Sequence, residues 1–178
     1  MNYADTHRDI VEACKSGQRS AQYTLYQNYS AAMYNICLRM LRNELDAEDV
    51  LQSSFMDVFA KLHTFRFDAS IGSWIKRIVV NNCINFLKKK RLQLEELDDS
   101  HQPVQEEKEN PELPYSINQI QEAIYQLPDG YRVVFSLYLM EGYDHKEIGE
   151  IMGISEATSK SQYSRAKKKL REVLLNCA

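Results

Sequence analysis

The sequence predicts an all-α protein made of two small helical domains joined by a flexible acidic linker. Apolar residues recur every three or four positions in each periodic segment, and no segment alternates polar and apolar residues over a useful length. A stretch rich in carboxylates and prolines interrupts this pattern at residues 93–115. We therefore expect one domain over residues 1–92 and a second over residues 116–178.

Four helices are predicted in the first domain, and Ser70 or Ser73 is expected to cap the fourth. There is no internal repeat and no βαβ pattern. The predicted apolar positions, helix by helix, are Ile10, Val11 and Cys14; Leu25, Tyr29, Ala32, Met33, Ile36, Cys37 and Met40; Val50, Leu51, Phe55, Val58, Phe59 and Leu62; and Ile75, Ile78, Val79, Cys83, Phe86 and Leu87.

The predicted linker has too little apolar surface to fold alone. Its carboxylates are interrupted by Pro103, Pro111 and Pro114, and Lys108 is its one cation. Burial of so few apolar groups cannot offset the loss of chain entropy on folding, so we expect a flexible segment. It is either a plain tether or a polyanion that occupies a basic channel on a partner.

The second domain is predicted to contain four helices. Ser116 and Gln119 have capping-box spacing at the start of the first helix, and Pro128 and Gly130 are expected to stop it. The second helix is expected to end near Gly142 and to carry Val133, Val134, Leu137 and Tyr138.

The last two helices predict a helix-turn-helix. Asp144 and Glu147 have capping-box spacing at the start of the first of them, and Gly153 in a left-handed conformation would end it. Gly149 lies where the next helix would have to pass close, and Ser155 can cap that next helix. Its inner side is predicted to carry Ala157, Tyr163, Ala166 and Leu170, and its outer side Ser159, Lys160, Gln162 and Arg165. In such a unit the second helix enters the major groove of DNA.

Composition excludes several classes of function. No window approaches roughly 18 consecutive apolar residues, and the chain starts without the apolar core of a signal peptide, so we expect a cytoplasmic protein. The cysteines form no Cys-x-x-Cys pair, and Cys37 and Cys83 are expected to be buried thiols on apolar helical faces. The histidines lie far apart and there is no glycine-rich phosphate loop. We therefore expect no enzyme, no metal site and no cofactor.

Charge is segregated along the chain, although the formal net charge is only -3. Residues 41–60 carry five carboxylates against one arginine, a net charge of -4, whereas residues 61–92 carry eight cations against one carboxylate, a net charge of +7. Residues 160–171 contain six cations and no carboxylate. The dipole of a helix end would account for only one or two of these cations, so the pattern predicts contact with two kinds of partner.

Three stretches of the sequence carry a resemblance to a known family. They read DAEDVLQSSFMDVFAKL from Asp46, FRFDASIGSWIKRIVVNNCINFLKKKR from Phe65 and LPDGYRVVFSLYLMEGYDHKEIGEIMGIS from Leu127. Together they resemble the extracytoplasmic-function (ECF) group of the sigma-70 family of transcription initiation factors. The stretches occur in the family's order, in a two-domain layout that lacks the extra domain of larger sigma factors.

The resemblance implies that the first domain docks on the coiled coil of the largest subunit of RNA polymerase and opens the minus-ten promoter element. Phe55 would supply apolar contact to the polymerase, although a phenylalanine at helical spacing is equally expected in the core. The residues that match the docking helix are Asp46, Glu48, Asp49, Gln52 and Phe55.

Strand opening requires aromatic, amide and cationic groups that hold the separated bases and backbone. By resemblance, the loop from Thr64 to Gly72 would form a pocket for an extruded base with Asn81 beneath it. Asn81 and Asn85 lie one helical turn apart, so both can face one strand. Trp74 is favoured as a core anchor over a DNA contact. The candidates for the minus-ten element are Phe65, Arg66, Phe67, Trp74, Lys76, Arg77, Asn81 and Asn85.

The second domain would bind the minus-thirty-five element. The family usually has a β-branched apolar residue in place of Ser159, an arginine in place of Gln162 and an aliphatic residue in place of Tyr163. The resemblance therefore does not predict which bases this domain recognises. Lys160, Lys167 and Lys168 are expected to contact phosphates. The full candidate set is Ser159, Lys160, Gln162, Tyr163, Arg165, Lys167 and Lys168.

The resemblance implies three partners: core RNA polymerase, promoter DNA and an anti-sigma factor, usually membrane-linked, that clamps the two domains. Direct membrane insertion is not expected. An alternative is a stand-alone helix-turn-helix regulator that binds duplex DNA and uses the first domain for an effector or for dimerisation. A regulator of that kind does not need the basic, aromatic and asparagine-bearing segment at residues 65–91.

Overall fold

The computed structural model describes residues 7–94 and 115–176. Contacts divide the chain into two compact units, residues 1–90 and 91–178. The described residues are helical and contain no strand, which confirms the predicted all-α fold. No helix within these ranges is long and apolar enough to cross a membrane. The predicted linker lies almost wholly outside the described residues.

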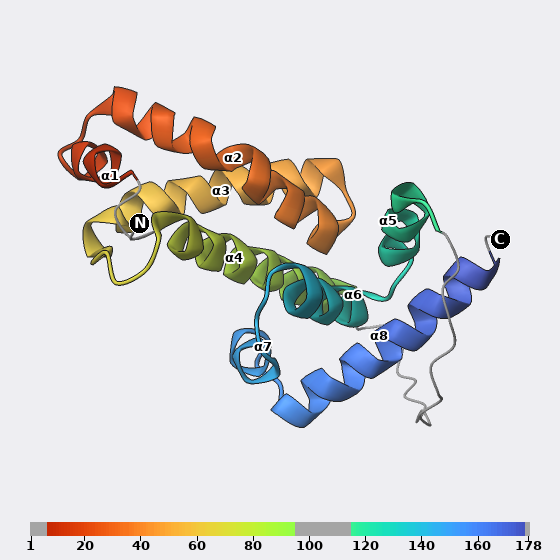
Figure 1. Cartoon of the computed structure of the whole chain (residues 1–178). Coiled ribbons are helices and arrows are strands. Elements are labelled where there is room, and N and C mark those ends of the chain that lie inside the picture. The colour runs from red at the N-terminus through yellow and green to blue at the C-terminus, as the bar shows by residue number, and fades with distance from the viewer. Residues whose placement is uncertain (1–6, 95–114, 177–178) are drawn as a thin grey trace. The chain divides into compact units, whose positions relative to one another are not determined.

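The first unit is built from long helices that pack side by side (Figure 1). A turn of two residues joins α2 to α3, and an ion pair joins the start of α3 to the end of α4, so consecutive long helices run antiparallel. The elements are α1 (Arg8–Lys15), α2 (Arg19–Leu41), α3 (Glu44–Lys61), the 3₁₀ turn η2 (Leu62–Thr64) and α4 (Ile71–Leu94).

Polar side chains define where α3 and α4 begin. The Asn43 side chain accepts a hydrogen bond from the Asp46 amide at 2.9 Å, and Ser70 Oγ accepts one from the Ser73 amide at 3.1 Å. Ser70 is therefore the cap of α4. Each bond satisfies a backbone donor that the first helical turn leaves unpaired.

The core of the first unit draws side chains from all four helices. Each fully buried aliphatic side chain stabilises the fold by about 1.5–3 kcal/mol. Cys37 and Cys83 lie in this core with their Sγ atoms 3.7 Å apart, and the hydrogen bond between them, together with burial, raises the pKa of Cys83. Both are buried free thiols, as predicted. The buried core residues include Val11, Leu25, Ile36, Val50, Val58, Ile75 and Val79.

The described part of the second unit contains three short α-helices followed by one long helix, α8 (Figure 1). Both predicted capping boxes are present, Ser116 with Gln119 and Asp144 with Glu147. The elements are α5 (Ile117–Tyr125), α6 (Asp129–Phe135), the π-helical segment η3 (Ser136–Met140), α7 (His145–Met152) and α8 (Glu156–Asn176).

The turn between α5 and α6 differs from the prediction. Pro128 is the N-cap of α6 and Gly130 lies inside that helix, so these residues begin the next helix as well as ending the one before. A fully buried arginine holds the turn: the Arg132 guanidinium donates to the Leu127 carbonyl oxygen at 2.8 Å and to the Asp129 carboxylate at 2.6 Å. These partners compensate the cost of burying its charge.

Candidate nucleic-acid and protein interfaces

One face of α3 combines acidic, amide and apolar side chains in solvent. Leu45 and Met56 are each 73% exposed. With Asp49 and Gln52, which are also exposed, they stand at helical spacing on one side of α3, and we call this set the α3 face. Its apolar members were not among the predicted site residues. The sequence signal that could have identified them is that both are large apolar residues on the side of α3 opposite its predicted apolar face.

Phe55 does not belong to that face, which corrects the predicted polymerase contact. Its side chain is only 3% exposed, and its ring packs against Tyr26 at 4.8 Å and Phe59 at 6.1 Å between centroids. Phe55 is therefore a core residue of the first unit. The apolar contribution to any docking surface on α3 comes from Leu45 and Met56 instead.

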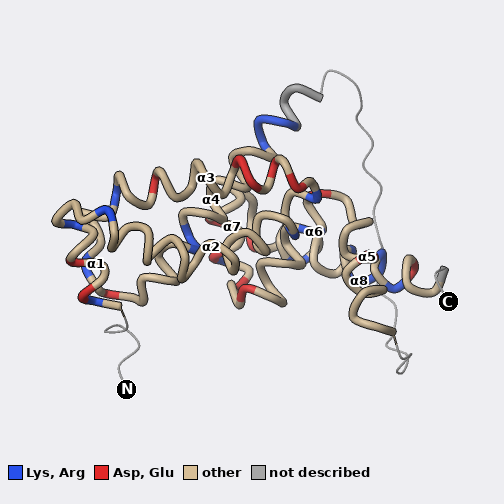
Figure 2. The backbone as a smooth tube through the Cα atoms, turned by 90° about the horizontal axis from the view of Figure 1, so that it is seen from above, with Lys and Arg blue, Asp and Glu red and all other residues tan. Residues whose placement is uncertain are grey.

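The start of α3 is acidic and lies next to the cationic end of α4. The Lys90 ammonium is 2.9 Å from the Asp46 carboxylate, so Asp46 is already paired within the chain. Glu48 and Asp49 are exposed. The backbone coloured by charge shows these acidic and basic groups side by side (Figure 2). Opposite charges thus meet along a short stretch of surface, with the carboxylates of α3 available to a basic partner.

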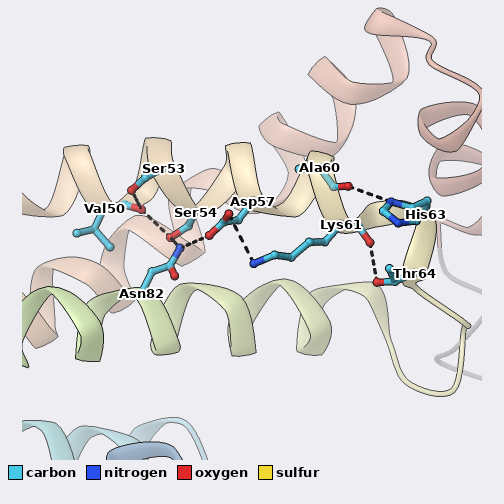
Figure 3. Close-up of polar contacts among 9 residues, drawn as sticks. All are labelled: Val50, Ser53, Ser54, Asp57, Ala60, Lys61, His63, Thr64 and Asn82. Carbon is cyan, nitrogen blue, oxygen red and sulfur yellow. Dashed lines mark hydrogen bonds and ion pairs between the residues drawn. The ribbon is translucent and has the colours of Figure 1, made fainter.

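A polar network fixes α4 against α3 (Figure 3). The Asn82 amide nitrogen donates to Ser54 Oγ at 3.1 Å and to the Asp57 carboxylate at 3.0 Å, and Ser54 Oγ in turn donates to the Val50 carbonyl oxygen at 2.6 Å. Asp57 also lies 3.6 Å from the Lys61 ammonium. An asparagine in mid-helix is tolerated when its amide is satisfied in this way. Asn82 was not predicted to have a role, and its contacts fix the rotation of α4.

That rotation determines where the neighbouring asparagines point. Asn85 is exposed and Asn81 is half-buried, and the two lie one turn apart on α4. Because Asn82 faces α3, Asn81 and Asn85 stand on a different part of the helix surface. Arg77 is exposed and Lys76 is half-buried on the same helix. The exposed Arg77 guanidinium and the amides of Asn81 and Asn85 recur at four-residue spacing on α4, so they can contact one nucleic-acid strand together.

The loop before α4 carries an aromatic cluster. Phe65 is 4% exposed, with its ring 4.9 Å from that of Phe67 and 5.4 Å from that of Trp74 between centroids. Phe65 is therefore a core residue, which corrects its prediction as a DNA contact. Phe67 and Trp74 are half-buried, and Arg66 is exposed. The loop and the first turn of α4 can present one cation and the exposed parts of two rings to a base.

Phe67 has an unusual backbone conformation, with φ at 63°. A bulky residue seldom adopts this left-handed conformation unless its surroundings hold it there. Two cations of α1 lie over its ring, the Arg8 guanidinium at 4.6 Å and the Lys15 ammonium at 4.5 Å from the centroid. These contacts were not predicted from the sequence, because they join residues that are 59 and 52 positions apart.

The corner between α7 and α8 forms as the sequence predicts. Gly153 ends α7 with φ at 73°, and Ser155 Oγ accepts a hydrogen bond from the Thr158 amide at 3.0 Å. A Cβ atom on Gly149 would lie 2.8 Å from the Ile154 carbonyl oxygen, so only glycine allows this close approach. The result is a helix-turn-helix with α8 as its second helix.

The inner side of α8 is shifted from the predicted one, and Ser159 is the main correction. Ser159 is fully buried, and its hydroxyl lies 2.9 Å from His145 Nδ1 on α7, whereas Ala157 is exposed. The buried side of α8 therefore begins at Ser159. Its small polar side chain faces α7 because the two helices approach closely at this corner. Ser159 cannot contact a base without unfolding that corner.

Tyr163 and Gln162 also point toward neighbouring helices of the second unit more than toward solvent. The Tyr163 ring lies 4.6 Å from that of Tyr138 and 6.0 Å from that of Phe135 between centroids. Gln162 is half-buried, with its Oε1 close to Gly130 of α6. Tyr163 is thus mainly a packing residue, and Gln162 offers only part of its amide to a base.

The cations of α8 occupy its open side. Lys160, Lys167 and Lys168 are exposed, and Arg165 is half-buried. The Lys160 ammonium is 2.6 Å from the Glu156 carboxylate, and this hydrogen bond and charge lower the pKa of Glu156. The Lys167 ammonium lies 5.1 Å from the centroid of the Tyr163 ring. This row of positive groups suits a phosphate backbone.

No cluster of three or more His, Cys, Asp or Glu side chains that could hold a metal ion occurs among the described residues. His145 bonds to Ser159, His7 Nδ1 lies 2.9 Å from the Tyr29 hydroxyl, and His63 Nδ1 lies 2.9 Å from the Ala60 carbonyl oxygen. These three histidines are engaged in separate local contacts.

Comparison with known families and proteins gives a consistent result. Residues 25–93 match the family model for sigma-70 region 2, and residues 117–170 match that for sigma-70 region 4. The chain is 29% identical to the ECF RNA polymerase sigma factor SigW of Bacillus subtilis, over 92% of this chain and 94% of that protein. It is 32% identical to the RNA polymerase sigma factor SigZ of the same organism, over 73% of each chain.

Solved structures share the fold. The sigma factor RpoE, in complex with the anti-sigma factor NepR from Bartonella quintana, has a TM-score of 0.59 at 20% identity and covers 85% of this chain and 95% of its own. CnrH, in complex with the cytosolic domain of CnrY, has a TM-score of 0.60 at 21% identity and covers 98% of this chain and 100% of its own. With two family models, two relatives and the quoted motifs in agreement, the chain belongs to the ECF group of the sigma-70 family of RNA polymerase sigma factors.

Proposed function

We propose that this protein is a promoter-specificity subunit that works in the cytoplasm, binds core RNA polymerase and directs it to promoters, with no catalytic activity of its own. One observation carries the proposal. The segment that matches region 2 presents two half-buried aromatic rings, an exposed amide and exposed cations, and the segment that matches region 4 presents a row of cations on the second helix of a helix-turn-helix. A chain that only binds duplex DNA needs the second surface and not the first.

The first unit opens the minus-ten element. Bases that leave the stack need aromatic and amide groups to hold them, and the separated backbone needs cations. Phe67 and Trp74 supply the ring edges, and Asn81 and Asn85 supply amides. The cations are Arg66, Lys76 and Arg77.

The second unit binds the minus-thirty-five element through α8. Lys167 and Lys168 contact phosphates and set the position of the helix on the duplex, and Lys160 does so when a phosphate replaces its Glu156 partner. Arg165 and the open part of Gln162 are the groups left for base edges. Since Ser159 is buried, it orders the corner of the helix-turn-helix and does not take part in base recognition.

Docking on core polymerase uses the α3 face. Exposed carboxylates attract a basic helical partner, and burial of Leu45 and Met56 adds an apolar contribution. Asp49 and Gln52 lie between these two apolar side chains on the same face, and Glu48 lies beside them. Asp46 contributes less, since Lys90 already neutralises it.

Run-off transcription tests the proposal. Core RNA polymerase is combined with the full-length protein on a library of promoter fragments, and transcripts are sequenced. We expect initiation from a subset of fragments that share two spaced elements, and none with core polymerase alone. If no fragment gives a transcript, while the protein alone binds duplex DNA tightly and with sequence preference, a stand-alone regulator is the correct function.

Control by an anti-sigma factor is part of the proposal. RpoE, which shares the fold, is described in complex with the anti-sigma factor NepR. The α3 face is the surface that such an inhibitor would have to cover. Transcription from a responsive promoter should rise when the inhibitor's gene is deleted, and equal transcription in both strains would contradict this control.

A further inference from the structure

The helix α1 lies before the segment that matches region 2, which begins at residue 25, yet it contacts the loop that follows η2. The Lys15 ammonium donates a hydrogen bond to the Phe65 carbonyl oxygen at 2.8 Å and lies 4.5 Å from the centroid of the Phe67 ring. It is also 4.0 Å from the Glu12 carboxylate. One side chain of α1 therefore holds the loop on both sides of Arg66.

These contacts hold a conformation that the loop would otherwise leave. Phe67 has a left-handed backbone with φ at 63°, which is costly for an aromatic residue. A charge-assisted hydrogen bond to the carbonyl of Phe65 and a cation over the ring of Phe67 offset that cost. The Lys15 side chain is only 21% exposed, so water weakens both contacts little.

We propose that Lys15 is a positioning residue for strand opening, which presets residues 65–67 in the conformation that receives the separated minus-ten strand. This inference rests on the function proposed above. A loop that is ordered before DNA arrives loses less conformational freedom when it binds. Without the Lys15 ammonium only the Arg8 guanidinium still lies over the Phe67 ring, so the DNA has to order more of the loop and opening is slower.

The alternative that Lys15 contacts a DNA phosphate makes a different prediction. Its ammonium is already engaged with the Phe65 carbonyl oxygen and the Phe67 ring. Loss of a phosphate contact lowers the slope of log binding constant against log salt concentration by about 0.7–0.9, whereas loss of a positioning contact leaves the slope unchanged. The salt dependence of promoter binding therefore separates the two roles.

The experiment measures promoter opening by holoenzyme, with 2-aminopurine in the minus-ten element of a fragment that the wild-type protein opens. Lys15→Met keeps the aliphatic stem and removes the charge, and we expect opening to be about fivefold to tenfold slower. Lys15→Arg restores a cation and should recover most of the rate. The matched control is Arg19→Met, which removes one charge from an exposed position at the start of α2 and should leave the rate within about twofold.

A spectroscopic readout follows the loop itself. Trp74 is the single tryptophan of the chain, and its ring packs on Phe65. In the free protein, acrylamide should quench its fluorescence more strongly in Lys15→Met than in the wild type, and equally in Arg19→Met and the wild type.

A double-mutant cycle distinguishes loss of the specific Lys15 contacts from a general loss of stability. Phe67→Leu removes the ring that Lys15 contacts and keeps the hydrogen bond from Lys15 to the Phe65 carbonyl oxygen, so it should slow opening, and Lys15→Met should slow that variant by a smaller factor than it slows the wild type. Additive effects, unchanged opening in Lys15→Met, failure of Lys15→Arg to recover the rate, or a reduced salt slope would each overturn the proposal. Failure of the wild-type holoenzyme to open any fragment would instead remove the proposed function, and no Lys15 variant is needed to see it.

Discussion

Adjacent residues of this protein can have different roles, one in the core and the next on the exposed surface. Phe55 is 3% exposed and Met56 is 73% exposed, and fully buried Ser159 precedes exposed Lys160. One step along a helix turns the side chain by about 100°, so neighbours in the sequence face different surroundings. Substitutions at neighbouring positions should therefore affect stability in one case and partner binding in the other.

Ser159→Ala tests this separation in the second unit. The change removes the hydroxyl that lies against His145 Nδ1 and leaves a partly buried ring nitrogen without that partner. We expect the free energy of unfolding to fall by about 1 kcal/mol. The minus-thirty-five sequences selected from a randomised library should be unchanged. Ser161→Ala, at an exposed position of α8, serves as the control, and an altered base preference in Ser159→Ala would show that Ser159 contacts DNA after all.

Gly149→Ala tests the corner of the helix-turn-helix. The added Cβ would lie 2.8 Å from a backbone oxygen, so α7 and the turn must shift, and we expect a loss of about 1–3 kcal/mol in the free energy of unfolding. Gly130→Ala is the matched control, because its Cβ would lie no closer than 3.6 Å to a side chain and alanine favours the helix. Thermal unfolding of the full chain measures both. Equal midpoints for the two variants would contradict the packing argument.

Individual helices were predictable where local chemistry specifies them. The starts of α5 and α7 follow from capping boxes, and the end of α7 follows from a glycine, because these signals act within a few residues. The inner side of α8 was predicted correctly at Tyr163, Ala166 and Leu170 and wrongly at its start, since Ala157 and Ser159 are both small and give little contrast in hydrophobicity. The contacts of Lys15 with the loop after η2 could not be predicted, because they depend on how distant segments pack.

The α3 face gives a prediction for polymerase binding. We expect Leu45→Ser with Met56→Ser to weaken binding to core polymerase by about tenfold or more, because each apolar side chain buried in a complex contributes about 1.5–3 kcal/mol. Stability should change little, since both side chains are exposed in the free protein. Fluorescence anisotropy with labelled protein measures the affinity. Tyr23→Ser, at another exposed apolar position of the first unit, is the control, and an equal loss in that variant would argue against a specific face.

Charge reversal on α8 gives the complementary prediction. Lys160→Glu with Arg165→Glu should abolish promoter-specific initiation, because attraction to phosphates becomes repulsion, while affinity for core polymerase stays the same. Asp49→Lys with Gln52→Ala should lose polymerase binding and keep the intrinsic DNA contacts of α8. Anisotropy measures the affinity of both variants for core polymerase, run-off transcription is measured on the α8 variant, and direct binding to promoter DNA is measured on the α3 variant. Loss of polymerase affinity in the α8 variant, or loss of DNA binding in the α3 variant, would mean that the surfaces are assigned to the wrong helices.

At the scale of the whole molecule, each proposed DNA-binding surface is supported by its own core. The aromatic loop and α4 rest on the core of the first unit, and α8 rests on a cluster around Leu127 and Phe135 in the second. The formal net charge of -3 conceals two basic surfaces because carboxylates gather elsewhere in the sequence. The net charge of the chain is therefore a poor guide to its partners, because the basic surfaces lie on two separate units.

Separate cores should also unfold separately. Leu25 in the first unit and Leu127 in the second are both fully buried, and replacing either with alanine should cost about 2–5 kcal/mol. Because Trp74 lies in the first unit, Leu25→Ala should lower the unfolding midpoint seen by tryptophan fluorescence and leave amide-exchange protection in α8 unchanged, whereas Leu127→Ala should do the reverse. A shift of the Trp74 transition in Leu127→Ala as large as that in Leu25→Ala would mean that the two units fold as one, and that a change at one promoter-binding surface is transmitted to the other through the fold itself.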